Sequence, residues 1–174
     1  DDDGVTFKST YDGSLHRLTP EKAVEIQNAL GSDIQMALDV CPPLPADKEI
    51  IELAVERTNS WALRARKHFL KTSYDSPNQH AQFGIAQGGL DLNLRKKSAE
   101  QIVEIGFDGY AIGGLSVGET REEMLDPMKE SVKYLPRERP RYFMGLGDPA
   151  GLVEAIFSGI DMFDCVWPTR LARH

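Results

Sequence analysis

Five short apolar segments end in residues that can bind or react with a polar molecule. These residues are Asp39, Gln87, the pair Gly113 and Gly114, Met144 with Gly145, and Asp164. Carboxylates accept hydrogen bonds from amidine-like N–H edges, and a glutamine side chain can pair with a carbonyl. Glycines let backbone N–H groups approach a ligand closely, and methionine covers flat apolar surfaces. Such a set suits a planar, hydrogen-bonding heterocycle such as guanine.

Each of these residues also has an explanation that involves no ligand. Asp39 precedes a proline-rich turn and could form that turn or cap a helix, while Gln87 and the glycines could serve tight turns alone. Met144 could simply fill the core. Asp164 lies in an apolar segment, where burial of an acid costs free energy unless it has a partner or a task. We therefore expect Asp164 to be a buried functional acid, and Asp161 to be a turn residue.

Helical patterns alternate with the short apolar segments along the chain. Strands are expected over residues 34–39, 83–89, 109–114, 141–145 and 160–166, and helices over 20–30, 47–70, 91–105, 121–134 and 149–158. Thr19 before a proline, Thr120 with an acid three residues later, and Asp148 before a proline are typical helix starts. A polar loop is expected around residues 73–78.

Strands separated by helices of ordinary length predict a parallel α/β sheet. Two architectures remain open: a doubly wound open sheet, or a (β/α)8 TIM barrel, which needs eight units and about 250 residues. The chain holds about five such units, so a barrel would be incomplete. In both architectures ligands bind beyond the carboxyl ends of the strands, where the residues above are expected.

Composition limits the class of protein. The 174 residues are 41% apolar, enough for one domain or part of one, and 20 basic against 27 acidic residues give a net charge of -7. That balance argues mildly against nucleic-acid binding. No apolar run is long enough to cross a bilayer, and Cys41 and Cys165 lack disulfide or metal-binding spacing. We expect a soluble cytoplasmic protein with reduced thiols, no membrane partner and no metal ligands in this chain.

Four segments together resemble the successive signatures of the tRNA-guanine transglycosylase (queuine tRNA-ribosyltransferase) family. They are FGIAQGG at 83–89, GGLSVGE at 113–119, RYFMGLG at 141–147 and DMFDCVWPTR at 161–170. Residues 3–7 and 19–22 also resemble the family. The resemblance implies a (β/α)8 barrel with a zinc subdomain, exchanging the wobble guanine of tRNA anticodons for a 7-deazaguanine base in queuosine biosynthesis, as a pentosyltransferase.

The resemblance also implies a role for each site residue. Asp164 would attack the anomeric carbon of the ribose, forming a covalent ribosyl-enzyme and releasing guanine, and the incoming base would then displace the enzyme. Asp39 would accept from the N–H edge of the purine, while Gln87 and the backbone N–H of Gly114 would meet its carbonyl oxygen. Met144 would stack on the ring.

Further positions match the family around this core. The backbone carbonyl of Leu115 would contact the side arm of the 7-deaza base, and Glu119 would hold the Leu115 peptide in place. Arg170 and Arg173 match basic positions that contact the anticodon loop. Cys41 and Val117 are typical of bacterial members, whose incoming base is 7-aminomethyl-7-deazaguanine; eukaryotic members have a smaller residue at the position of Val117, which makes room for queuine.

Residues 1–174 match the central part of the family's catalytic domain. The family's proton-transfer aspartate would precede them, and the zinc ligands of the carboxyl-terminal subdomain would follow. An isolated piece of this kind would expose two sheet edges, so we expect it to be inactive. The resemblance also implies that the full-length protein is a homodimer, as bacterial members usually are. Alternatives are a non-catalytic tRNA-binding subunit, an archaeal-type relative inserting another deazapurine, or an unrelated barrel enzyme; the presence of all three polar site residues disfavours the subunit.

Overall fold

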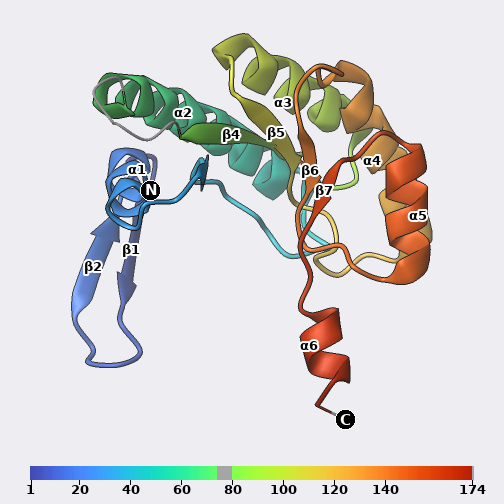
Figure 1. The fold of residues 1–174 in the computed structure, drawn as a ribbon, viewed down its shortest axis with the longest axis horizontal. Coiled ribbons are helices and arrows are strands. Elements are labelled where there is room, and N and C mark those ends of the chain that lie inside the picture. Colours follow the sequence, from blue (N-terminus) through green and yellow to red (C-terminus); the bar gives the residue numbers. More distant parts are fainter. Residues whose placement is uncertain (74–79, 174) are drawn as a thin grey trace.

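The computed structural model describes residues 1–73 and 80–173, and it contains one large parallel sheet (Figure 1). Its five strands are hydrogen-bonded in the order β3-β4-β5-β6-β7. They span Ile34–Met36 (β3), Ala81–Ala86 (β4), Gly109–Ile112 (β5), Arg141–Phe143 (β6) and Met162–Phe163 (β7). The predicted loop around 73–78 lies largely outside the described residues.

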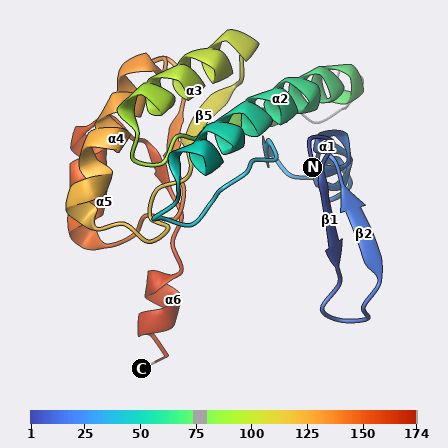
Figure 2. The ribbon, with the colours of Figure 1, turned by 180° about the vertical axis from the view of Figure 1, so that it is seen from behind.

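The strand order decides between the two predicted architectures. A doubly wound sheet reverses direction at a switch point, so that later strands add to the opposite edge. Here every strand pairs in parallel with the next one in the chain, from β3 to β7, without reversal. The sheet is curled into a half-barrel with its helices on the outer side, as Figures 1 and 2 show. The incomplete (β/α)8 prediction is confirmed, and the open doubly wound alternative is wrong.

The predicted helices are present, and their starting signals act as expected. Their bounds are Pro20–Ala29 (α1), Lys48–Ser73 (α2), Leu92–Ile105 (α3), Arg121–Tyr134 (α4) and Pro149–Phe157 (α5). The Thr19 hydroxyl accepts from the backbone N–H of Lys22 at 3.2 Å. Thr120 and Glu123 form a complete capping box before α4, and Asp148 caps α5. The first N–H groups of a helix have no acceptor within the helix, and these capping side chains accept from them. Because the caps are close in sequence to the groups they bond, the helix starts could be located from the sequence.

The strands end earlier than predicted. The first four predicted strands extend to residues 39, 89, 114 and 145, but β3 to β6 end at residues 36, 86, 112 and 143, and β7 has only two residues. Glycines with positive φ follow three of these ends, at Gly88, Gly114 and Gly145, and turn the backbone out of the sheet. The residues predicted to do chemistry therefore lie mostly in loops just beyond the strands, where backbone N–H groups are free of the sheet ladder.

Two further elements were not predicted. An antiparallel hairpin pairs Val5–Lys8 (β1) with Leu15–Leu18 (β2), and a short helix spans Trp167–Leu171 (α6). Both extend away from the sheet in Figures 1 and 2. Their four or five residues are largely exposed and too short to show a periodic pattern.

The two faces of the sheet carry different residues. Gly84 on β4 lies against the side chains of Ile102 and Phe107, which places it on the outer face, toward α3. Side chains alternate along a strand, so Phe83 and Ile85 lie on the inner face. No helix among the described residues is long and apolar enough to span a membrane.

Candidate active site

A pocket of about 250 Å³ lies at the carboxyl ends of the strands. It is lined by Asp39, Cys41, Gly113, Gly114, Leu115, Ser116, Val117, Tyr142, Met144, Gly145 and Asp164. Loops after β3, β5, β6 and β7 all contribute, and Gln87 from the loop after β4 is bonded to Asp39. The structure thus brings the predicted base-binding residues and the predicted nucleophile to one place. Arg170 and Arg173 do not line this pocket; Arg170 lies on α6, Arg173 lies just beyond it, and both are exposed.

Asp39 and Gln87 form a hydrogen-bonded pair at one side of the pocket. The Gln87 Nε2 donates to Asp39 Oδ2 at 2.6 Å, and the Gln87 backbone N–H donates to the Ser98 hydroxyl at 2.9 Å. Burial raises the pKa of the Asp39 carboxyl, and the hydrogen bond from Gln87 opposes that rise. Asp39 is therefore the acid that bears a desolvation cost, which N–H donors of a ligand would offset.

Asp164 lies on the other side of the pocket, and its predicted burial is wrong. The side chain is exposed, because β7 is a two-residue strand at the edge of the sheet and nothing among the described residues covers it. Its Oδ1 accepts from the Tyr142 hydroxyl at 2.6 Å and from the Gly145 backbone N–H at 2.8 Å. No donor among the described residues reaches Oδ2. One oxygen is thus anchored, while the other remains available for nucleophilic attack.

Tyr142 is a site residue that sequence analysis missed. Burial, followed by its bond to the Asp164 carboxylate, raises the pKa of the Tyr142 hydroxyl, so the phenol stays protonated and remains a donor near neutral pH. The signal that could have identified it is the period of a strand: Tyr142 precedes Met144 by two residues and points to the same face.

Replacing Tyr142 with phenylalanine tests this anchoring. We expect kcat for base exchange in the full-length enzyme to fall about tenfold, because hydrogen bonds to charged groups contribute about 1.5–3 kcal/mol and Gly145 still holds the carboxylate. The KM for the base should change little. Steady-state kinetics with labelled guanine measures both quantities.

A matched control is Tyr134→Phe. The Tyr134 hydroxyl also donates to a carboxylate, that of Glu130 at 3.0 Å, but it lies at the end of α4 and lines no part of the pocket. This control should retain the unsubstituted kcat. An unchanged kcat in Tyr142→Phe would show that the hydroxyl does not position the nucleophile.

Glu119 orients the peptide that joins Leu115 to Ser116. Its Oε1 accepts from the backbone N–H of Ser116, and its Oε2 accepts from the N–H of Val117 at 3.0 Å. The Ser116 N–H and the Leu115 carbonyl belong to the same peptide unit, so the carboxylate determines which way that carbonyl points. The geometry is consistent with the predicted role of Glu119, while contact between Leu115 and a base stays a prediction.

Gly114 approaches Gln87 so closely that no side chain fits there. Its φ is +66°, and an added Cβ would overlap Gln87 Oε1. At the pocket rim, burial and then the charge of Asp39 raise the pKa of the Cys41 thiol, while the Gly114 N–H and the Gln87 side chain oppose that rise. The Gly114 N–H therefore points toward Cys41 at the pocket rim, and the buried Gln87 amide lies beside the pocket, against Gly114 and Asp39.

The arrangement defines a class of protein: a parallel β/α barrel wall whose loops bring a half-buried carboxylate, an amide, a backbone N–H and an anchored, exposed carboxylate together around one pocket. No group of three or more His, Cys, Asp or Glu side chains among residues 1–73 and 80–173 could hold a metal ion.

Comparison with known proteins identifies the family. The profile of the family described as Queuine tRNA-ribosyltransferase matches residues 1–174, and the chain belongs to this family. The queuine tRNA-ribosyltransferase of Thermotoga neapolitana is 56% identical over 174 residues, which are 100% of this chain and 46% of the relative. That of Halothermothrix orenii is 51% identical over 173 residues, 99% of this chain and 45% of the relative. The chain thus spans less than half the length of these relatives, and the family resemblance stated above is confirmed.

Proposed function

We propose that residues 1–174 form the central part of the catalytic domain of a tRNA-guanine transglycosylase, which exchanges the wobble guanine of a tRNA for a 7-deazaguanine base. The observation that carries the proposal is one pocket lined both by Asp39, which is hydrogen-bonded to Gln87, and by the anchored carboxylate of Asp164. The first group can hold a purine by its edge, and the second can attack the sugar attached to it. The names of the relatives support the same chemistry.

The proposed reaction proceeds through two displacements at the ribose. The free Oδ2 of Asp164 attacks the anomeric carbon, a C–O bond forms as the bond from that carbon to guanine breaks, and the electron pair leaves with the base. The departing guanine takes up a proton. The incoming deazaguanine gives up the proton of its ring nitrogen as that nitrogen bonds to the anomeric carbon and releases the Asp164 carboxylate, and the family's proton-transfer aspartate, which would precede these residues, would carry the proton. The Tyr142 and Gly145 donors keep Oδ1 in place during both steps.

Recognition of the base uses the opposite wall of the pocket. Asp39 accepts from the adjacent N–H groups of the purine, Gln87 and the Gly114 N–H donate to its carbonyl oxygen, and Met144 covers the ring. Asp39 is desolvated and accepts a hydrogen bond from Gln87 before the ligand binds. The pocket therefore favours a base whose N–H edge donates the remaining hydrogen bonds to the Asp39 carboxylate. A site with unpaired buried polar groups strongly rejects analogues that lack the matching groups.

The target base would be extruded from the anticodon loop and held in the pocket. Such recognition requires only a few local cations, so the net charge of -7 does not oppose it. Arg170 and Arg173, exposed at α6, are proposed to contact the loop. The family's zinc is proposed to lie in a subdomain outside these residues, and the proposal assigns none of the described residues to it.

The identity of the incoming base is a further part of the proposal. Cys41 and Val117 line the pocket, and we assign 7-aminomethyl-7-deazaguanine as the preferred base. In competition against labelled guanine, the full-length enzyme should take this base at least about tenfold better than queuine, because the Val117 side chain limits the space for a bulkier arm. Val117→Gly should narrow that preference. A preference for queuine by the unsubstituted enzyme would overturn the assignment.

The direct test of the proposed function is a covalent adduct with tRNA. Full-length enzyme incubated with a substrate tRNA, then denatured, should retain the tRNA on the protein. A non-catalytic subunit would bind tRNA without an adduct, and that result would contradict the proposal.

A further inference from the structure

Arg95 is a fully buried cation behind the candidate active site. It lies on α3 with 0% of its surface exposed, and its guanidinium donates only to backbone carbonyls among the described residues. The Nε donates to Gly89 at 2.7 Å, Nη1 donates to Gly113 at 2.7 Å and Ala86 at 3.3 Å, and Nη2 donates to Gly114 at 2.8 Å. The side chain thus ties the loop after β4 to the loop after β5.

No carboxylate among residues 1–73 and 80–173 lies in direct contact with the Arg95 guanidinium. Burial lowers the pKa of its guanidinium to about 9, and the charge of Glu119 opposes that shift, so Arg95 remains cationic at neutral pH. A buried cation is costly unless hydrogen bonds compensate it. The four carbonyls that accept hydrogen bonds from Arg95 offset the cost of burying its charge. The positive potential of that charge remains directly behind the pocket.

Two of these carbonyls belong to peptides that line the pocket. The Gly113 carbonyl and the Gly114 N–H are the two ends of one peptide unit, and the Gly114 carbonyl and the Leu115 N–H are the ends of the next. Among the described residues the Gly114 N–H makes no hydrogen bond to an oxygen, and the group it interacts with is the Cys41 thiol, a weak acceptor. A cation on the oxygen of a peptide polarises that peptide, which strengthens its N–H as a donor.

We propose that Arg95 is a positioning residue that strengthens the Gly114 N–H as a hydrogen-bond donor to the carbonyl oxygen of the bound purine. Arg95 does not touch the base; it acts through the Gly113–Gly114 peptide. This inference rests on the proposed function, because it needs a purine carbonyl opposite Gly114.

The same contact has a consequence for the reaction. When the bond between ribose and guanine breaks, the electron pair leaves with the base, and part of the negative charge develops on its carbonyl oxygen. A donor that is already oriented and polarised stabilises this charge without reorganisation at the moment of reaction. Arg95 would thus contribute to specificity for a carbonyl-bearing base and to the departure of that base.

The test compares two bases that differ at one atom. In 6-thioguanine the carbonyl oxygen of guanine is replaced by sulfur, a weak acceptor, while the N–H edge that faces Asp39 is retained. The dissociation constants of both bases are measured by calorimetry for the full-length enzyme and for its Arg95→Lys and Arg95→Gln variants. The ratio of the two constants does not depend on the fraction of protein that is folded.

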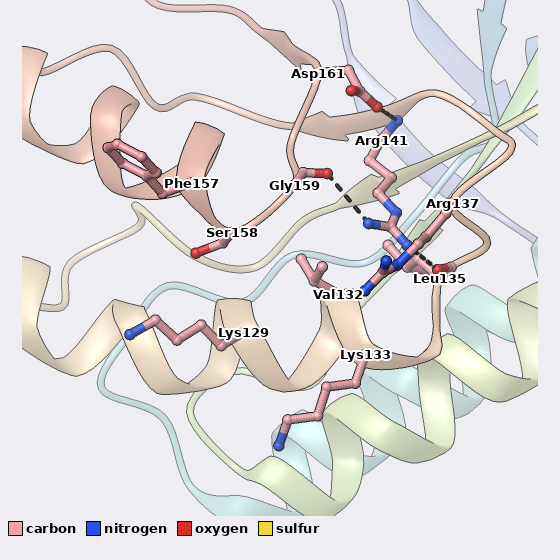
Figure 3. Close-up of a pocket in the computed structure, with 10 residues that line it drawn as sticks. All are labelled: Lys129, Val132, Lys133, Leu135, Arg137, Arg141, Phe157, Ser158, Gly159 and Asp161. Carbon is pink, nitrogen blue, oxygen red and sulfur yellow. Dashed lines mark hydrogen bonds between the residues drawn. The ribbon is translucent and has the colours of Figure 1, made fainter.

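A matched control is Arg141→Lys. Arg141 is also a buried arginine, 7% exposed, and it also donates to backbone carbonyls, those of Leu135 and Gly159 (Figure 3) and that of Pro136. It begins β6, at the end of the sheet away from the candidate active site, and lines a separate pocket. Its replacement removes a similar set of bonds without contact to Gly113 or Gly114.

The unsubstituted enzyme and the Arg141→Lys control should prefer guanine to 6-thioguanine by the same factor. Arg95→Lys should reduce that preference about fivefold and Arg95→Gln about tenfold, because lysine retains the charge and glutamine does not. An unchanged preference in both Arg95 variants, even with weaker binding of both bases, would reduce Arg95 to a structural brace and overturn the inference. Failure of the unsubstituted enzyme to bind either base would instead contradict the proposed function.

A second measurement needs no substitution and decides the case if neither Arg95 variant folds. The carbonyl ¹³C resonance of Gly113 reports the bond that it accepts from Arg95. Guanine binding should move this resonance downfield, since a donor engaged at one end of a peptide strengthens the bond accepted at the other. 6-Thioguanine should move it less. Equal shifts with both bases, or none with guanine, would contradict the proposal.

Discussion

Asp164→Asn should reduce base exchange by the full-length enzyme by about four orders of magnitude or more, with no covalent adduct to tRNA. The amide cannot displace the base from the ribose, whereas it can still accept the bonds from Tyr142 and Gly145 that hold Oδ1. The fold and the affinity for free guanine should therefore be retained. Single-turnover exchange of labelled guanine and retention of tRNA on denatured protein measure the two effects.

Asp161→Asn is the matched control for this substitution. Asp161 precedes Asp164 by three residues, and its Oδ2 accepts from the Arg141 backbone N–H at 2.9 Å, at the other end of the strand pair. Exchange activity and the adduct should persist in this variant. An adduct that persists in Asp164→Asn as well would show that another residue is the nucleophile.

Asp39→Asn should weaken guanine binding and lower kcat/KM for exchange by about three orders of magnitude. The carboxylate is expected to accept two N–H groups of the base, and an amide presents one donor that would face them. The amide oxygen of the replacement can still accept from Gln87, so the pocket should keep its shape. Calorimetry with guanine and steady-state kinetics provide the measurements, with Asp161→Asn again as control.

The pH dependence of binding provides an independent test of the same residue. Burial raises the pKa of Asp39, and only the ionised carboxylate accepts both N–H groups. Guanine affinity should therefore fall as the pH falls through this raised pKa, beginning at a higher pH than for an ordinary aspartate. The loss should be absent in Asp39→Asn, and a similar loss in that variant would assign the titration to another group.

The stability of the ligand-free protein should respond to pH in the direction opposite to guanine affinity. A carboxyl with a raised pKa in the folded state is stabilising below its unfolded pKa, and this stability is lost as the pH rises through the folded pKa. At neutral pH the ionised Asp39 therefore destabilises the empty pocket, and Asp39→Asn should raise Tm by a few degrees. An unchanged or lower Tm would show that the carboxylate carries no desolvation cost.

Local interactions made much of this protein predictable from its sequence. Helix starts at Thr19, Thr120 and Asp148 depend on contacts within three residues, so they were located correctly. The alternation of strands and helices predicted a parallel sheet, and the ends of the strands predicted where Asp39 and Gln87 would meet. The family resemblance, which depends on several short segments together, added the chemistry.

Other features depend on contacts between distant parts of the chain, and only the tertiary structure decided them. The unreversed strand order established a barrel wall rather than an open sheet, since strand neighbours are not encoded in any one segment. Asp164 is exposed because its strand lies at the sheet edge, although its apolar neighbours predicted burial. Arg95 lies on a helix of mixed character, and only the packing of that helix brings its charge behind Gly114. Sequence determined which residues could act, while the pairing of strands and the packing of α3 decided which of them lie at the pocket, because burial and hydrogen-bond partners are properties of the folded chain.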